Sequence, residues 1–145
     1  MSLALRCCCC RKDKGKRHQQ PEAELQAKCV EWMRKNDYLF VASAVTQYKN
    51  GARTAAGLAR RGVEAGVPDL LILEKPARGR NGILAVELKI GKNRISEKQA
   101  EWLGRAKARG HVTVVAYTLD EFTRAVMSHL HPGSGAAAQP MVLEE

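Results

Sequence analysis

One strand-like segment constrains the fold of this chain more than any other feature. Residues 83–90 read ILAVELKI, an apolar run interrupted by one Glu and one Lys. Because side chains alternate across a strand, Glu87 and Lys89 share one face while Val86 and Leu88 share the other. A Glu and a Lys inside such a strand cost free energy if they are buried, unless a metal ion or an anionic ligand compensates them. The alternative is a strand with one solvated face, on which the two residues pair without function.

The preceding strand candidate supplies a second carboxylate. Residues 67–74 (VPDLLILE) are joined to residues 83–90 by a polar link that is too short for a crossover, which predicts an antiparallel hairpin. Asp69 follows Pro68 at the opening of this strand, where a proline is tolerated. In the hairpin, Asp69 can approach Glu87 on one face. Two neighbouring carboxylates repel each other, and a shared divalent cation removes the repulsion.

The ligand types indicate the metal and the role of the lysine. Carboxylate oxygens with open coordination positions favour Mg²⁺ or Mn²⁺ over zinc. Lys89 lies beside both carboxylates, so its charged form should be favoured. We therefore interpret Lys89 as a stabiliser of negative charge on a reacting phosphate, or as an orienter of the attacking water, rather than as a neutral base.

Periodicity and capping predict the remaining elements. We expect helices over residues 21–36, 96–110 and 118–130, and further strands over 38–45 and 111–117. Two capping boxes, Ser96 with Gln99 and Thr118 with Glu121, mark the starts of the last two helices. Residues 47–66 form an irregular, glycine-containing stretch around one short helix. The order is α-β-β-β-α-β-α, which predicts an α/β fold with a basic tail (1–20), one domain (21–130) and a flexible C-terminal tail (131–145).

The charge of the chain is uneven. The formal net charge is +9, and residues 1–20 hold six bases and one acid. A basic surplus favours anionic partners, nucleic acid before a membrane surface. The four adjacent cysteines Cys7–Cys10 lack the spacing of a zinc module, so we interpret them as part of a disordered, redox-sensitive tail, with lipidation as the alternative. Cys29 fits the apolar side of the first helix, and no apolar run is long enough to span a bilayer.

Four segments in order resemble a known family. They are E-x-E-L-Q (22–26), G-V-P-D (66–69), V-E-L-K (86–89) and I-S-E-K-Q-x-x-W (95–102). Together they resemble the PD-(D/E)XK nuclease superfamily and are more specifically similar to the virus-type replication-repair nuclease (VRR-NUC) domain, over about residues 21–127. The resemblance implies a restriction-endonuclease-like core (αβββαβ) with a central mixed four-stranded sheet flanked by helices.

The resemblance also implies roles for the residues of the hairpin. Asp69 and Glu87 match the metal-binding carboxylates of the family, and the backbone carbonyl of Leu88 matches a further metal ligand. Lys89 matches the catalytic lysine. Asp69, Glu87 and Lys89 are thus the expected centre of the reaction.

Two helices are expected to complete the site. Gln99 matches the active-site glutamine of the family, although its position in the capping box allows a purely capping role. Glu24 matches a carboxylate of the first helix that can complete a metal site, and we prefer it to Glu22 for that role. Glu24 could instead serve the helix N-terminus without touching a metal.

The expected function is that of an Mg²⁺- or Mn²⁺-dependent DNA endonuclease. The resemblance implies structure-specific cleavage of branched DNA or Holliday junctions in replication, recombination or repair, by a homodimer. Arg53, Arg60 and Arg61 are candidate contacts to DNA phosphates. The alternatives are a restriction-like or exonucleolytic nuclease acting on linear DNA, and a non-catalytic DNA-binding protein.

Other classes find no support in the sequence. It shows no glycine-rich nucleotide site, no Ser-His-Asp triad and no redox dithiol, so we expect no nucleotide cofactor. We expect a soluble intracellular protein with no membrane partner. The distribution of the resembled family places it in the cytoplasm of a bacterium or of a host infected by a virus or phage.

Overall fold

The computed structural model describes residues 19–43, 55–77, 79 and 81–131 of the chain. Its elements in chain order are α1 (Gln19–Lys35), β1 (Phe40–Ala42), α2 (Ala55–Arg60), β2 (Leu70–Ile72), β3 (Leu84–Leu88), α3 (Glu97–Ala108), β4 (Val112–Ala116) and α4 (Leu119–Leu130). This order confirms the predicted succession of elements, with α2 as the short helix expected within residues 47–66. Most of the two predicted tails (residues 1–18 and 132–145) lies outside the described residues.

The four strands form one mixed sheet in the order β1-β2-β3-β4. β1 pairs with β2 and β2 pairs with β3 in antiparallel fashion, which confirms the predicted hairpin of β2 and β3. β3 and β4 are parallel because α3 provides the crossover between them. β3 therefore lies inside the sheet, hydrogen-bonded on both sides.

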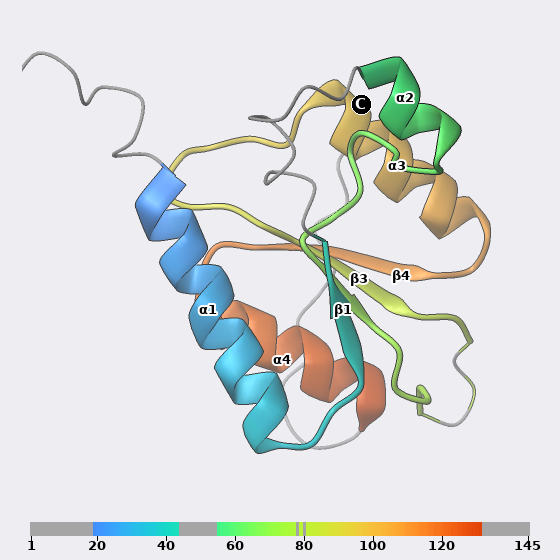
Figure 1. Ribbon diagram of the computed structural model, residues 1–145. Helices are drawn as coiled ribbons and strands as arrows, with labels where there is room; N and C mark the ends of the chain where they lie inside the picture. The colour runs from blue at the N-terminus through green and yellow to red at the C-terminus, as the bar shows by residue number, and fades with distance from the viewer. Residues whose placement is uncertain (1–18, 44–54, 78, 80, 132–145) are drawn as a thin grey trace, which may run out of the picture.

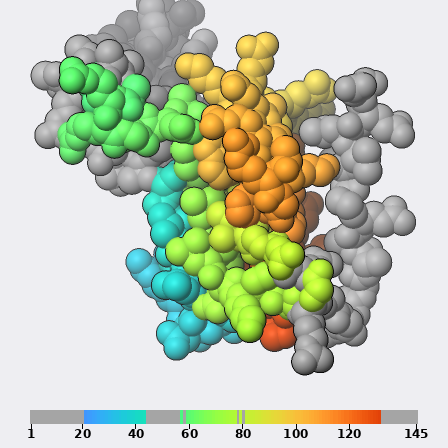
Figure 2. Space-filling model, turned by 90° about the vertical axis from the view of Figure 1, so that its right-hand side faces the viewer, coloured from blue at the N-terminus to red at the C-terminus, as the bar shows by residue number. Residues whose placement is uncertain are grey.

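Helices cover both faces of this sheet (Figure 1). α1 and α4 contact each other and β3 on one face, while α3 packs against β4 on the other. In Figure 2, which faces the right-hand side of Figure 1, the orange atoms around α3 lie above the yellow-green atoms of the β2–β3 hairpin. None of the described helices has the length and apolar content needed to cross a membrane.

The core fills the space between the sheet and the pair α1 and α4. β3 is buried along its whole length, which requires helices over both of its faces. The largest fully buried apolar side chains come from α1, α4 and the two central strands: Met33, Leu70, Ile72, Leu84, Val86, Leu88, Phe122 and Val126. Cys29 is also fully buried in this cluster, as expected from its helical phase.

Several predicted boundaries are wrong by a few residues. α1 begins at Gln19 rather than at Pro21, because a proline in the first turn removes an N–H that has no partner within the helix. β1 covers Phe40–Ala42 where residues 38–45 were predicted, of which residues 44 and 45 lie outside the described residues. β2 begins at Leu70 rather than at residue 67, since Pro68 cannot donate to the ladder.

The second predicted capping box is half formed. The Thr118 side chain accepts from the backbone N–H of Glu121 (3.1 Å), as an N-cap should. The Glu121 carboxylate, however, accepts from the backbone N–H of Tyr117 (2.7 Å) instead of that of Thr118. The start of α4 is still fixed, with the glutamate reaching one residue further back than a capping box requires.

Candidate active site

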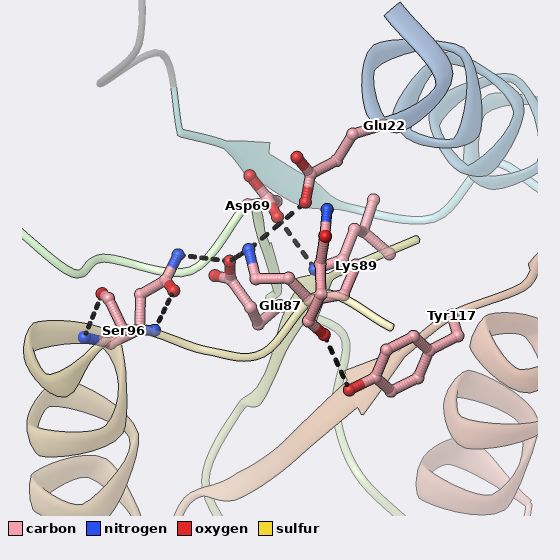
Figure 3. A network of polar contacts seen from close by, with 9 residues as sticks. Glu22, Asp69, Glu87, Lys89, Ser96 and Tyr117 are labelled. Carbon is pink, nitrogen blue, oxygen red and sulfur yellow. Dashed lines mark hydrogen bonds and ion pairs between the residues drawn. The ribbon is translucent and has the colours of Figure 1, made fainter. Parts of the chain in front are cut away.

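The register of the hairpin sets the two predicted carboxylates side by side. Leu70 pairs with Val86 in the antiparallel ladder of β2 and β3. Continuing that register by one residue places Asp69 opposite Glu87, and side-chain alternation turns both away from the face of Leu70 and Val86. Figure 3 shows Asp69, Glu87 and Lys89 converging at this end of the two strands. The structure thus brings together the three residues that the sequence singled out.

The proline before Asp69 changes the hydrogen bonding of β3. Lys89 donates its backbone N–H to the Ala116 carbonyl of β4 (3.0 Å), so the alternate residue Leu88 turns its backbone groups toward β2. There the Leu88 N–H donates to Oδ2 of Asp69 (2.8 Å). The residue opposite Leu88 is Pro68, which has no N–H to donate to the Leu88 carbonyl. That carbonyl therefore lacks its ladder partner on β2 and can serve as a ligand.

Glu87 is the most deeply buried charged group of the site, with 1% of its surface exposed. Its Oε1 accepts from Nζ of Lys89 (2.5 Å) and from Nε2 of Gln99. Its Oε2 is buried and has no hydrogen-bond partner among the described residues. Burial raises the pKa of Glu87 to about 7, and the charges of Asp69 and Glu22 act in the same direction while Lys89 opposes them. A buried oxygen of this kind requires a proton or a cation.

Asp69 and Lys89 carry shifts that fit the same picture. Burial raises the pKa of Asp69, although the Leu88 N–H and the charge of Lys89 work against that increase. Burial by itself would lower the pKa of Lys89, but its hydrogen bond to Glu87 and the charges of Glu87 and Glu22 outweigh burial and raise the pKa. Lys89 is therefore charged at neutral pH, in line with the predicted role as a stabiliser of negative charge.

Gln99 combines the two roles that the sequence left open. Its Oε1 accepts from the backbone N–H of Ser96 (2.8 Å), and Oγ of Ser96 accepts from the backbone N–H of Gln99 (3.3 Å), so the predicted capping box is complete. The Nε2 of the same side chain donates to Glu87. The capping box thus fixes the orientation in which the amide meets Glu87.

The structure corrects the choice of the first-helix carboxylate. Glu24 is exposed, whereas Oε1 of Glu22 lies 3.2 Å from Nζ of Lys89 (Figure 3). Glu22 stands seven residues, two helical turns, before the buried Cys29, so both occupy one face of α1. This phase was present in the sequence and favours Glu22. The preference for Glu24 was wrong about which side chain faces the site.

Gly66 supports the site in a way that was not predicted from the sequence. Its φ of +86° is strained for other residues, and a Cβ atom there would lie 2.2 Å from the Lys98 carbonyl oxygen. The loop that leads to Asp69 therefore passes directly against the first turn of α3, which holds Gln99. The glycine of G-V-P-D was the available signal, because close approach of two backbones is a common reason for a glycine.

Among the described residues, no hydrogen bond or ion pair links the predicted DNA-binding arginines to the site. Arg60 and Arg61 are exposed at the end of α2. Arg53 lies outside the described residues. Their binding to DNA phosphates stays a prediction.

The donor set fits a hard divalent cation. Within the described ranges, no group of three or more His, Cys, Asp and Glu side chains could hold a metal ion by itself. The site offers instead two carboxylates, of Asp69 and Glu87, and the Leu88 carbonyl. Such a set suits Mg²⁺, which keeps several waters and needs few protein ligands. The unpartnered Oε2 of Glu87 is the atom that a cation would satisfy.

Comparisons with known proteins point to one family. A solved structure described as a VRR_NUC domain protein matches with a TM-score of 0.59 and 27% sequence identity, over 74% of this chain and 86% of that chain. No curated protein matches the sequence. The family model of the VRR-NUC domain matches residues 12–118, from the basic tail to the start of α4. The chain therefore belongs to the VRR-NUC domain family, which implies a nuclease-type function with DNA as the substrate.

Proposed function

We propose that this chain is a DNA endonuclease that hydrolyses phosphodiester bonds with the help of Mg²⁺ or Mn²⁺. The observation that carries the proposal is the unpartnered, buried Oε2 of Glu87, opposite Asp69 and beside the charged Lys89. Nuclease chemistry needs acidic ligands and a fixed positive charge near the scissile phosphate. The site supplies both within one hairpin.

Each residue has a defined task in this proposal. Asp69, Glu87 and the Leu88 carbonyl would hold the ion, which when bound supplies an activated water and shares the negative charge of the phosphate. Gln99 holds Oε1 of Glu87, which leaves Oε2 for the ion. Lys89 keeps its proton and stabilises the charge that develops on the phosphate oxygens.

The finer form of the substrate is proposed from the family resemblance. The resemblance implies action on branched DNA as a homodimer. A homodimer of this chain would bring two sites to the two strands of a junction. We therefore propose branched DNA or Holliday junctions as the preferred substrate, in replication, recombination or repair.

The test compares wild type with Asp69→Asn and Lys89→Ala on labelled four-way junctions, flaps and linear duplexes. We expect metal-dependent internal cleavage of the branched substrates by wild type and loss of cleavage with retained binding by both variants. Release of nucleotides from ends, or equal cutting of linear duplex, would replace the endonuclease with an exonucleolytic or restriction-like activity. Binding without any metal-dependent cleavage would refute the enzyme. Equal cutting by all three proteins would show that the activity does not come from this site.

A further inference from the structure

Acidic groups outnumber basic groups among the residues of the site described above, which disfavours the approach of DNA. Glu22, Asp69 and Glu87 contribute three acidic groups and Lys89 one basic group, all linked by the contacts described above. One divalent ion would cancel the remaining charge without creating a surplus that could attract the flanking phosphates. DNA carries one charge per roughly 1.7 Å of helix axis, so its neighbouring phosphates need positive partners close to the site.

The loop between β3 and α3 offers such partners. Lys92 and Arg94 lie in this loop, and both are exposed. Lys92 follows Lys89 by three residues, which limits the separation of their Cα atoms to about 11 Å. Arg94 precedes Gln99 by five residues. The segment that carries both bases therefore runs from one residue of the active site, Lys89, to another, Gln99.

The loop is fixed at three points. The backbone N–H of Asn93 donates to the Ile90 carbonyl (3.0 Å), which closes a turn around Gly91. The Tyr117 hydroxyl, at the end of β4, donates to the Asn93 carbonyl (3.2 Å). The Ser96 capping box fixes the exit into α3. Figure 3 shows Tyr117 and Ser96 on opposite sides of Lys89, so the loop is held on both sides of the site.

We propose that the β3–α3 loop binds backbone phosphates of the DNA beside the scissile bond through Lys92 and Arg94, with Tyr117 as a positioning residue. The inference rests on the proposed function, because it places the DNA backbone across this site. A loop held between two strands and a capped helix presents its bases with little loss of conformational entropy on binding. The lysine and the arginine would act on the phosphates irrespective of base sequence.

The experiment measures DNA binding apart from cleavage. Fluorescence anisotropy with a labelled four-way junction and a labelled duplex, in EDTA, gives Kd over a series of salt concentrations. For the double variant Lys92→Ala/Arg94→Ala we expect the slope of log Kd against log salt to fall by about 2, and the affinity near 0.1 M salt to drop about 10- to 60-fold. Lys92→Arg should keep the wild-type slope.

The matched control removes the same charge elsewhere. Lys75 is exposed and follows the C-terminal end of β2, whereas Asp69 precedes the N-terminal end. Lys107 is exposed on α3, about 12 Å along the helix from Gln99. Lys75→Ala/Lys107→Ala should leave the slope within experimental error of wild type. Equal losses in the two double variants would show a general charge effect and would overturn the proposal, as would an unchanged slope in Lys92→Ala/Arg94→Ala.

The role of Tyr117 has its own readout. Tyr117→Phe keeps the ring and removes the hydroxyl, so hydrogen exchange of the amides in residues 91–95 should become faster and the affinity for DNA should fall severalfold. Unchanged exchange in that loop would refute the positioning role. Because all binding is measured without metal, failure of wild type to cleave would reject the proposed nuclease while leaving this phosphate contact standing. Conversely, metal-dependent cleavage by wild type with an unchanged salt slope in Lys92→Ala/Arg94→Ala would support the nuclease and reject the phosphate contact.

Discussion

Replacing Glu87 by Gln should stabilise the metal-free protein at pH 8 but not at pH 5. The carboxyl group is 1% exposed, and burial raises its pKa from 4.5 to about 7. A carboxyl group with a raised pKa contributes its full stability below the unfolded value, and this contribution is lost as the pH rises through the folded value. Wild type therefore loses stability between about pH 4.5 and about pH 7, whereas the neutral amide does not.

The magnitude follows from the same shift. Integrating the linkage from pH 5 to pH 8 gives a loss of about 2 to 3 kcal/mol for wild type relative to the variant. For a domain of this size that is a relative shift in Tm of about 10 °C. The protonated carboxyl and the amide are both neutral at pH 5, so the change with pH isolates the buried charge from other effects of the substitution.

The assay is thermal or urea unfolding of the metal-free proteins at pH 5 and pH 8, with Glu24→Gln as a control for an exposed carboxylate on α1. The difference between Glu87→Gln and wild type should move in favour of the variant at pH 8, whereas the control should show little change with pH. Saturating Mn²⁺ at pH 8 should shrink the advantage of the variant, because the ion stabilises more strongly the protein that binds it more tightly. A variant equally destabilised at both pH values would refute the reasoning about buried charge.

Three further substitutions test the supports of the site. Gly66→Ala should lower the free energy of unfolding by about 2 to 4 kcal/mol, because its Cβ would meet the backbone of α3. The control Gly104→Ala, at a helical position with open space around the Cβ, should raise the free energy of unfolding by up to about 1 kcal/mol. Equal effects of the two substitutions in urea unfolding would contradict this prediction. Ser96→Ala should cost about 1 kcal/mol of stability and should slow cleavage, because Gln99 would lose the orientation that the capping box gives it. Cleavage by this variant at the wild-type rate would show that the capping box does not contribute to the active site. Pro68→Ala would supply an N–H to the opposing carbonyl, so calorimetry should show weaker Mn²⁺ binding; unchanged affinity would remove that carbonyl from the ligand set.

The hairpin shows why much of the site could be predicted. The period of two in a strand and the short link to its neighbour were enough to place Asp69, Glu87 and Lys89 on one face. The capping pattern placed Gln99 at the first turn of α3, but the contact of its amide with Glu87 depends on how the helix packs on the sheet. Local sequence rules contain no such information.

The first helix shows what the sequence alone does not determine. The phase of Glu22 relative to Cys29 was readable, yet the approach of Glu22 to Lys89 requires the distance between α1 and the end of β3, which only the packed structure gives. The hydrogen bond of Tyr117 to Asn93 joins residues 24 positions apart, from the end of β4 to the loop before α3. Contacts of this kind depend on tertiary packing, and no periodicity in the chain predicts them.

Calorimetric titration with Mn²⁺ at pH 8 tests the central claim most directly, that Asp69 and Glu87 share a divalent ion. Wild type and Glu24→Gln should bind the ion with similar affinity, and Asp69→Asn and Glu87→Gln should each lose at least about tenfold, since each removes a charged oxygen ligand. Wild-type affinity in Asp69→Asn, or no binding by the folded wild-type protein, would contradict the account.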